Sequence, residues 1–167
     1  MARVGAIILA AGQASRFRAQ DPSIASKVLA SLDGKPLVRH VADAALASRA
    51  RPVIVVTGHA REGVHAALAG LDVSIVHNDA YADGMAGSLQ AGVRALDGDC
   101  EAAIILLADM PRIPSSFIDA LTRAFESQPG ADAVVPLYDG QRGNPVLLAR
   151  SLFGDIARLS GDEGARR

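Results

Sequence analysis

The sequence predicts an α/β fold with three layers, α/β/α, around a Rossmann-like and mostly parallel sheet. Short apolar runs alternate along the chain with segments whose apolar residues have helical spacing. The runs are continuous rather than alternating, which is typical of strands buried on both faces of a parallel sheet. Half of the 167 residues are apolar, and a chain of this length can bury one full core. We therefore expect residues 1–167 to form a single domain.

The same patterns place the individual elements. Strands are expected at residues 4–9, 52–56, 73–76, 102–107, 133–136 and 145–148. Helices are expected at residues 36–48, 61–68, 87–96, 114–125 and 151–159. Ligands of such sheets bind outside the carboxyl ends of the strands. The chemistry is therefore expected just after Leu9, Val56, Val76 and Leu107.

Composition excludes several classes of function. The net charge of −1 argues against a nucleic-acid partner, because nucleic-acid binding needs a large basic surface. Cys100 is the only cysteine, which rules out an internal disulfide and a zinc cluster. No apolar run approaches the roughly 20 residues that span a bilayer, and no basic segment precedes the first apolar run as in a signal peptide. We expect a cytoplasmic protein without a membrane partner.

A small-residue loop with two cations follows the first strand. Its residues are Leu9, Ala10, Ala11 and Gly12, and the cations are Arg16 and Lys27. Small residues let backbone N–H groups approach a phosphate while cations neutralise it. The G-x-G-x-x-G and G-x-x-x-x-G-K-[ST] fingerprints are both absent. The loop therefore indicates a nucleotide bound by its phosphates; the alternative is a tight turn with two solvated cations.

Asp109 follows the strand expected at 102–107 and begins the sequence Asp109-Met110-Pro111. Its carboxylate is expected to face the ligand crevice. Mg²⁺ is usually held by one or two carboxylates together with substrate phosphates, which makes Asp109 a candidate ligand. An aspartate that merely ends a strand in a turn is the alternative.

The segment at residues 78–89 links a strand to a helix. Asn78, Gly84 and Ser88 are its candidate nucleotide contacts, because the glycine permits close backbone approach and the serine lies near a helix N-terminus. An ordinary capped loop would look the same.

Two further polar segments lie near the C-terminus. Residues 138–145 carry Arg142 and Asn144, which are candidate substrate contacts, although a plain hairpin turn also explains this segment. Residues 161–166 contain Asp162, a candidate second metal ligand, and Arg166, a candidate phosphate contact. The chain ends directly after them, so a frayed terminus and a truncated C-terminal end both remain open.

Taken together, these motifs resemble those of the MobA-like nucleotidyltransferases, and most of all the branch of molybdenum cofactor cytidylyltransferases. The family motifs are L-A-[AG]-G-x-S-x-R-[MF]-G…K, G-M-x-x-S-L, D-M-P, R-G-H-P and G-D-x-G-A-R. Here they stand at residues 9–17 with Lys27, 84–89, 109–111, 142–145 and 161–166. The chain departs from these motifs at three places: Arg18 replaces a glycine, residues 19–26 are inserted before Lys27, and Asn144 replaces a histidine.

The resemblance implies the nucleotide-diphospho-sugar transferase type of fold and a Mg²⁺-dependent transfer of CMP from CTP to a molybdopterin acceptor. It implies that Arg16 and Lys27 bind the triphosphate, that Asp109 and Asp162 bind Mg²⁺, and that residues 9–12 contact the nucleotide. Ala11 favours CTP over GTP, because Ala-Gly-Gly is typical of enzymes that use GTP. A molybdoenzyme or its chaperone would receive the product.

Two other functions remain open. One is a guanylyltransferase or a sugar-phosphate nucleotidylyltransferase with the same fold. The other is a nucleotide-binding protein that matures a cofactor without catalysis. All three would share one architecture.

Overall fold

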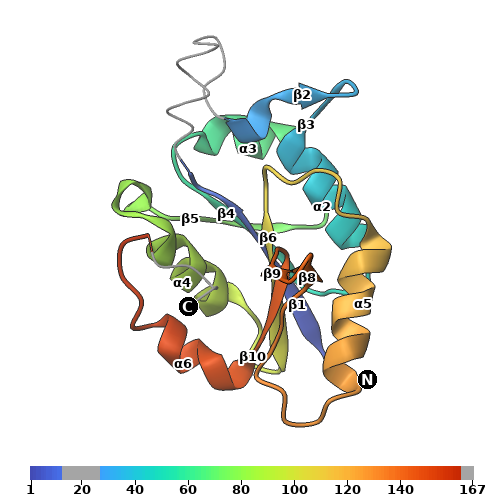
Figure 1. Cartoon of the computed structure of the whole chain (residues 1–167). Coiled ribbons are helices and arrows are strands. Elements are labelled where there is room, and N and C mark those ends of the chain that lie inside the picture. Colours follow the sequence, from blue (N-terminus) through green and yellow to red (C-terminus); the bar gives the residue numbers. More distant parts are fainter. Residues whose placement is uncertain (13–26, 163–167) are drawn as a thin grey trace.

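The computed structural model describes residues 1–12 and 27–162. Their central element is a six-stranded sheet of order β5-β4-β1-β6-β10-β7 (Figure 1). Strands β5, β4, β1 and β6 run parallel to one another, and β10 is antiparallel to both β6 and β7. The predicted mostly parallel sheet is therefore confirmed. The strands are β1 (Val4–Ala10), β4 (Val53–Thr57), β5 (Ser74–His77), β6 (Ala102–Leu107), β7 (Ala133–Val134) and β10 (Val146–Ala149).

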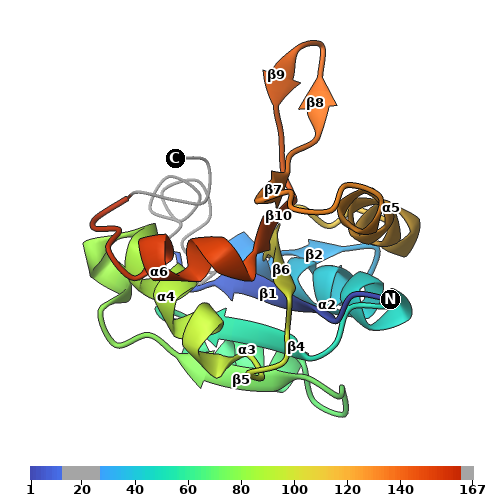
Figure 2. The ribbon, with the colours of Figure 1, turned by 90° about the horizontal axis from the view of Figure 1, so that it is seen from below.

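Helices cover both faces of the sheet, which confirms the three layers. One face packs against α2 (Leu37–Ala47), α3 (Arg61–Ala67) and α5 (Ser115–Glu126). The other face packs against α4 (Met85–Ala95) and α6 (Phe153–Ile156) (Figures 1 and 2). Strand β1 contributes to both clusters, because successive side chains of a strand point to opposite faces. Its apolar run is continuous because neither face meets water.

Two expectations from the composition concern Cys100 and membrane-spanning helices. Cys100 is fully buried at the entry to β6, and burial raises the pKa of its thiol. The cysteine is thus a small core residue. Among the described residues, no helix has both the length and the apolar character that a membrane crossing requires.

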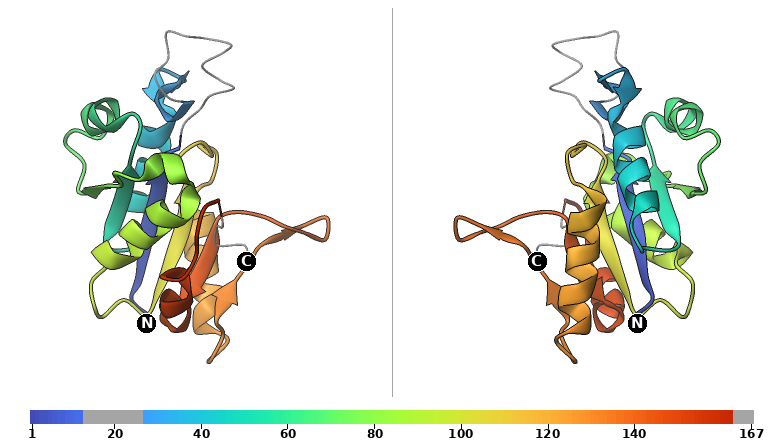
Figure 3. Two further views of the ribbon diagram at one scale, coloured as in Figure 1. Left: turned by 90° about the vertical axis from the view of Figure 1, so that its left-hand side faces the viewer. Right: turned by 90° about the vertical axis from the view of Figure 1, so that its right-hand side faces the viewer.

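Two short hairpins lie outside the main sheet. The first joins β2 (Ser31–Leu32) to β3 (Lys35–Pro36), and the second joins β8 (Leu137–Tyr138) to β9 (Gln141–Arg142). Each turn is an Asp-Gly pair in which both residues have positive φ, 53° and 79° in the first and 49° and 77° in the second. That conformation is the type I′ turn that Asp-Gly favours. The second hairpin projects from the body of the molecule (Figures 2 and 3).

Three predicted elements differ from their expected bounds by two residues or more, and the others agree to within one residue at each end. The helix expected at 151–159 is a 3₁₀ turn, Arg150–Leu152, followed by the short α6. At and beyond its end, Gln90 donates to the carbonyl groups of Ile156 and Leu159. The strand expected at 133–136 stops at Val134, where its pairing with β10 ends, and α4 begins two residues before the predicted start at residue 87.

Candidate active site

The four strand ends that were predicted to carry the chemistry form one row across the sheet. Leu9 pairs with Val56 on one side and with Leu107 on the other, and Val56 pairs with Val76. The strands are parallel, so their carboxyl ends open at the same edge. The loops that follow them therefore surround one site.

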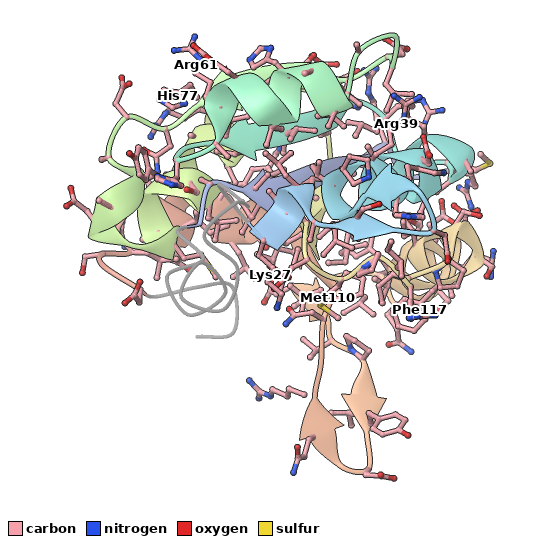
Figure 4. All side chains as sticks on the ribbon, turned by 90° about the horizontal axis from the view of Figure 1, so that it is seen from above. Lys27, Arg39, Arg61, His77, Met110 and Phe117 are labelled. Atoms are coloured by element: carbon pink, nitrogen blue, oxygen red, sulfur yellow. The ribbon has the colours of Figure 1, made fainter. Side chains whose placement is uncertain are left out.

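An ion pair lies at this edge. Lys27 Nζ is 3.5 Å from Asp109 Oδ2, and the side chains are 47% and 40% exposed. Figure 4 shows Lys27 next to Met110, the residue that follows Asp109. Two backbone hydrogen bonds fix the turn that carries Asp109: Ala108 donates to Leu9 at 3.1 Å and Met110 donates to Leu107 at 3.1 Å. The carboxylate is thus held at the site and remains open to a ligand.

Lys27 is positioned by the residues that follow it. It begins the 3₁₀ turn η1 (Lys27–Leu29), in which Val28 is buried in the core. Leu29 packs on Gly63 of α3, at a spot where even a β-carbon would overlap it. The Ala30 amide closes the turn by donating to the carbonyl of Lys27 at 3.0 Å, and the Leu37 amide at the start of α2 donates to the carbonyl of Ala30 at 3.0 Å. The turn that carries Lys27 is thus held against α2 and α3, and its ammonium group meets Asp109 in the loop after β6.

The loop after β1 divides into a buried and an exposed part. Ala11 is only 4% exposed and belongs to the same buried cluster as Ile7 and Val56. Gly12 is exposed, and no atom of the described residues lies within 4 Å of the place where a β-carbon would stand. The methyl group of Ala11 is thus part of the core, whereas Gly12 lies outside it. Arg16 lies outside the described residues.

Asn78 and Ser88 hold the next loop onto α4. The Asn78 Nδ2 group donates to Ser88 Oγ at 2.9 Å, and Asn78 Oδ1 accepts from the backbone of Ala80 at 3.1 Å. Both side chains are buried, 8% and 4% exposed. In this arrangement their polar atoms fasten the loop from 78 to 84 and thereby shape the wall of the site.

Gly84 touches the segment that carries Asp162. A β-carbon on Gly84 would overlap the carbonyl of Gly161 and lie 2.8 Å from the backbone nitrogen of Asp162. The φ of Gly84 is 114°, a value that residues with side chains rarely adopt. The structure therefore brings together two of the predicted motifs, which are 77 residues apart in sequence. Asp162 itself is exposed, and Arg166 lies outside the described residues.

Replacing Gly84 with alanine is expected to lower the free energy of unfolding by about 1–3 kcal/mol, because the backbone angle is strained for alanine and the segment at 161 must move. Gly154 is the matched control. It lies in α6 with nothing within 4 Å of a β-carbon, so Gly154→Ala should leave stability unchanged or raise it by up to about 1 kcal/mol. Urea denaturation measures both. Equal effects of the two substitutions would contradict the close contact at Gly84.

The two predicted substrate residues lie in the projecting hairpin and at its base. Arg142 is exposed in β9 and faces Leu137 across the hairpin. Asn144 is half-buried at its base. Leu137 and Tyr138 are 69% and 81% exposed, so this arm combines a cation with apolar surface.

A family model described as MobA-like NTP transferase domain matches residues 6–167 of this chain. The chain belongs to this family.

Relatives agree with this assignment. The bifunctional protein GlmU of Chromohalobacter salexigens is 40% identical over 155 residues, which cover 92% of this chain and 32% of that protein. The chain spans about a third of the length of the curated relatives that it matches. A nucleotidyl transferase from Methanothermobacter thermautotroptrophicus superposes with a TM-score of 0.80 at 26% identity, over 96% of this chain and 78% of that one. The chain is therefore a nucleotidyltransferase domain.

A further structure shows the same fold at lower identity. Rv0371C of Mycobacterium tuberculosis, a complex with manganese, superposes with a TM-score of 0.77 at 23% identity, over 98% of this chain and 80% of that one.

The oxygen donors of this MobA-like domain fit a hard divalent cation. Residues 1–12 and 27–162 contain no group of three or more histidine, cysteine or acidic side chains that could enclose a metal. Mg²⁺ needs no such group, since it keeps several waters and takes its other ligands from one or two carboxylates and substrate phosphates. Asp109 supplies a half-exposed carboxylate of this kind.

The sequence analysis missed Thr57 and Tyr81 at the same edge. Thr57 Oγ1 donates to the carbonyl of Val76 at 3.3 Å and lies 3.1 Å from His77 Nδ1. The ring of Tyr81 is 6.4 Å from that of His77, and its Cβ lies against Gly58. Thr57 is fully buried and joins the ends of β4 and β5, and Tyr81 lies against Gly58 beside the carbonyl of Ala11. Thr57 could have been found, because it directly follows Val56, one of the predicted strand ends.

Proposed function

We propose that this MobA-like domain transfers a nucleoside monophosphate from a nucleoside triphosphate to a phosphorylated acceptor and releases pyrophosphate. CTP is the proposed donor, in preference to GTP, and a molybdopterin cofactor is the proposed acceptor. The observation that carries the proposal is the ion pair of Lys27 and Asp109 beside the small-residue loop after β1. A cation and a carboxylate at one sheet edge are the groups that a triphosphate with its metal requires.

In the proposed reaction an oxygen of the acceptor phosphate attacks the α-phosphorus of the triphosphate. The bond from that phosphorus to the bridging oxygen breaks, and pyrophosphate leaves with the electron pair. The attacking oxygen already carries negative charge, so the chain needs no strong base. Catalysis then depends on orientation and on charge neutralisation.

Each residue has a proposed role. Lys27 and Arg16 neutralise the triphosphate and the departing pyrophosphate. Asp109 holds Mg²⁺ together with Asp162, and the ion supplies further neutralisation of the phosphate oxygens. The loop from Leu9 to Gly12 and the loop that contains Asn78, Gly84 and Ser88 form the nucleotide site. Asn78 and Ser88 act there through the loop that they hold, since their polar atoms bind each other.

The preference for CTP rests on the Ala10-Ala11-Gly12 sequence. The buried position of Ala11 supports an indirect effect, in which the core fixes the backbone that faces the base. On the acceptor side, Arg142 and Asn144 are proposed to bind the phosphate and polar edges of the pterin. The exposed apolar surface of the same arm suits a ring system.

A panel of nucleoside triphosphates, read out as pyrophosphate, tests the proposal. The protein is incubated with Mg²⁺ and CTP, GTP, UTP or ATP, each with molybdenum-loaded molybdopterin, with a sugar 1-phosphate, or without an acceptor. We expect release with CTP and the pterin. Release with GTP but not with CTP would contradict the CTP assignment. Release with a sugar 1-phosphate but not with the pterin would contradict the proposed acceptor. No release under any condition would favour a nucleotide-binding protein without catalysis.

A further inference from the structure

The C-terminal segment of the described chain is fastened along α4 by three hydrogen bonds. The N-cap residue of α4 is Gly84, which offers no side chain to cap the helix. The carbonyl of Gly161 takes this role, since it accepts a hydrogen bond from the backbone of Ala86 at 3.0 Å. The first turn of a helix leaves N–H groups without partners inside the helix. A distant part of the chain satisfies one of them here.

Gln90 supplies the other two bonds. Its Nε2 group donates to the carbonyl of Ile156 at 3.0 Å and to that of Leu159 at 2.9 Å. Ala86 and Gln90 are four residues apart in α4 and thus lie on the same face of the helix. We call residues 156–162 the C-terminal strap. The strap is held at both ends of this short stretch, by Gln90 and by Ala86.

The strap ends at the nucleotide loop. The backbone nitrogen of Asp162 would be 2.8 Å from a β-carbon on Gly84. The backbone of Asp162 therefore lies against the end of the loop that runs from 78 to 84. Gly161 has a φ of 60°, which turns the chain at this point. The orientation of Asp162, the last residue of the strap, therefore depends on how the preceding residues are held.

We propose that Gln90 is a positioning residue that sets the place of Asp162 at the metal site. This inference rests on the proposed function, because it takes Asp162 as a ligand of the divalent ion. Gln90 has no contact of its own with the reacting groups in this scheme. It acts through two carbonyl groups, the turn at Gly161 and the carboxylate that follows. Groups that hydrogen-bond directly to a metal ligand typically change metal affinity by about 10–100-fold when they are replaced, and Gln90 acts at a greater distance, so we expect the lower end of that range.

The test compares Gln90→Leu with Arg94→Leu. Leucine keeps much of the size of glutamine but cannot donate to the two carbonyls. Arg94 lies one turn further along α4 and is exposed, so its replacement is a matched control. Hydrogen exchange of the Ala86 amide reports directly on the bond to Gly161. Binding of Mn²⁺ as the probe ion, followed by loss of the free-ion electron paramagnetic resonance signal, reports on the metal site without turnover.

We expect Gln90→Leu to speed exchange at Ala86 and to weaken Mn²⁺ binding about tenfold, while Arg94→Leu changes neither. Asp162→Asn should weaken Mn²⁺ binding as well. The double substitution Gln90→Leu/Asp162→Asn should bind Mn²⁺ no more weakly than Asp162→Asn alone, because residues that act through one group are not additive. Pyrophosphate release should then need about ten times more Mg²⁺ for half-saturation in Gln90→Leu.

Three results would overturn the inference. Unchanged exchange at Ala86 would show that Gln90 does not hold the strap. Faster hydrogen exchange at Ala86 with unchanged Mn²⁺ binding would show that Gln90 holds the strap but does not influence the metal site. Additive losses in the double variant would show that Gln90 does not act through Asp162. A wild-type protein that binds Mn²⁺ but releases no pyrophosphate would contradict the proposed function instead, and the exchange and binding measurements would still decide the role of Gln90.

Discussion

Asp109→Asn is expected to slow pyrophosphate release by about 100-fold or more, because the amide cannot supply the negative charge that a divalent ion requires. The fold should be unaffected. The pair with Lys27 is half exposed, and such pairs contribute at most about 1 kcal/mol to stability. The rate is measured at saturating triphosphate over a range of Mg²⁺ concentrations, and the free energy of unfolding is measured in urea.

Asp43→Asn is the matched control for this change. Asp43 pairs with Lys35 at 2.9 Å, and the two side chains are 37% and 43% exposed, close to the values for Asp109 and Lys27. That pair lies between the β2–β3 hairpin and α2, outside the row of strand ends. Its loss should leave the rate unchanged. If Asp109→Asn keeps a near-normal rate, Asp109 has no place in the metal site.

Lys27→Met should reduce kcat/KM for the triphosphate by roughly 100-fold, since removing one preorganised group that stabilises the transition state costs about 10²–10³ in rate. Methionine keeps most of the aliphatic stem, so Val28 and Leu29 can still hold the turn in place. Lys27→Arg keeps the charge and should recover part of the activity. Initial rates over a range of CTP concentrations provide the measurement.

The control is Lys35→Met, which removes a cation of similar exposure from the pair with Asp43. We expect it to behave as the wild type. A high ionic strength should also narrow the difference between Lys27→Met and the wild-type protein, because salt screens the half-exposed ammonium group. An effect of Lys27→Met no larger than that of Lys35→Met would remove Lys27 from the triphosphate site.

The strand ends could be predicted because the sheet is parallel and buried. Continuous apolar runs locate its strands, and a parallel register aligns Leu9, Val56, Val76 and Leu107 in one row. Asp109 lies two residues after Leu107, so its position at this edge follows from the same pattern. The prediction succeeded where the local pattern and the fold demand the same residues.

Hydrogen bonds between side chains and residues far along the chain could not be predicted from local sequence patterns. Nothing near Ser88 indicates that its hydroxyl binds Asn78, and nothing near Ile156 indicates that Gln90 donates to its carbonyl. The β2–β3 hairpin is a different case. Its Asp33-Gly34 turn carries the same signal as Asp139-Gly140, but strands of two residues are too short to show an alternating pattern.

The place of β10 in the sheet has a consequence for biosynthesis. Residues 146–149 pair with β6 at residues 102–105 and thus enter the sheet about 40 positions after the strand beside them. Until they arrive on the nascent chain, β6 is an open edge with unpaired backbone groups, and such edges promote aggregation. A chain that stalls on the ribosome before residue 146 should therefore expose a partly folded parallel core whose β6 edge is unpaired.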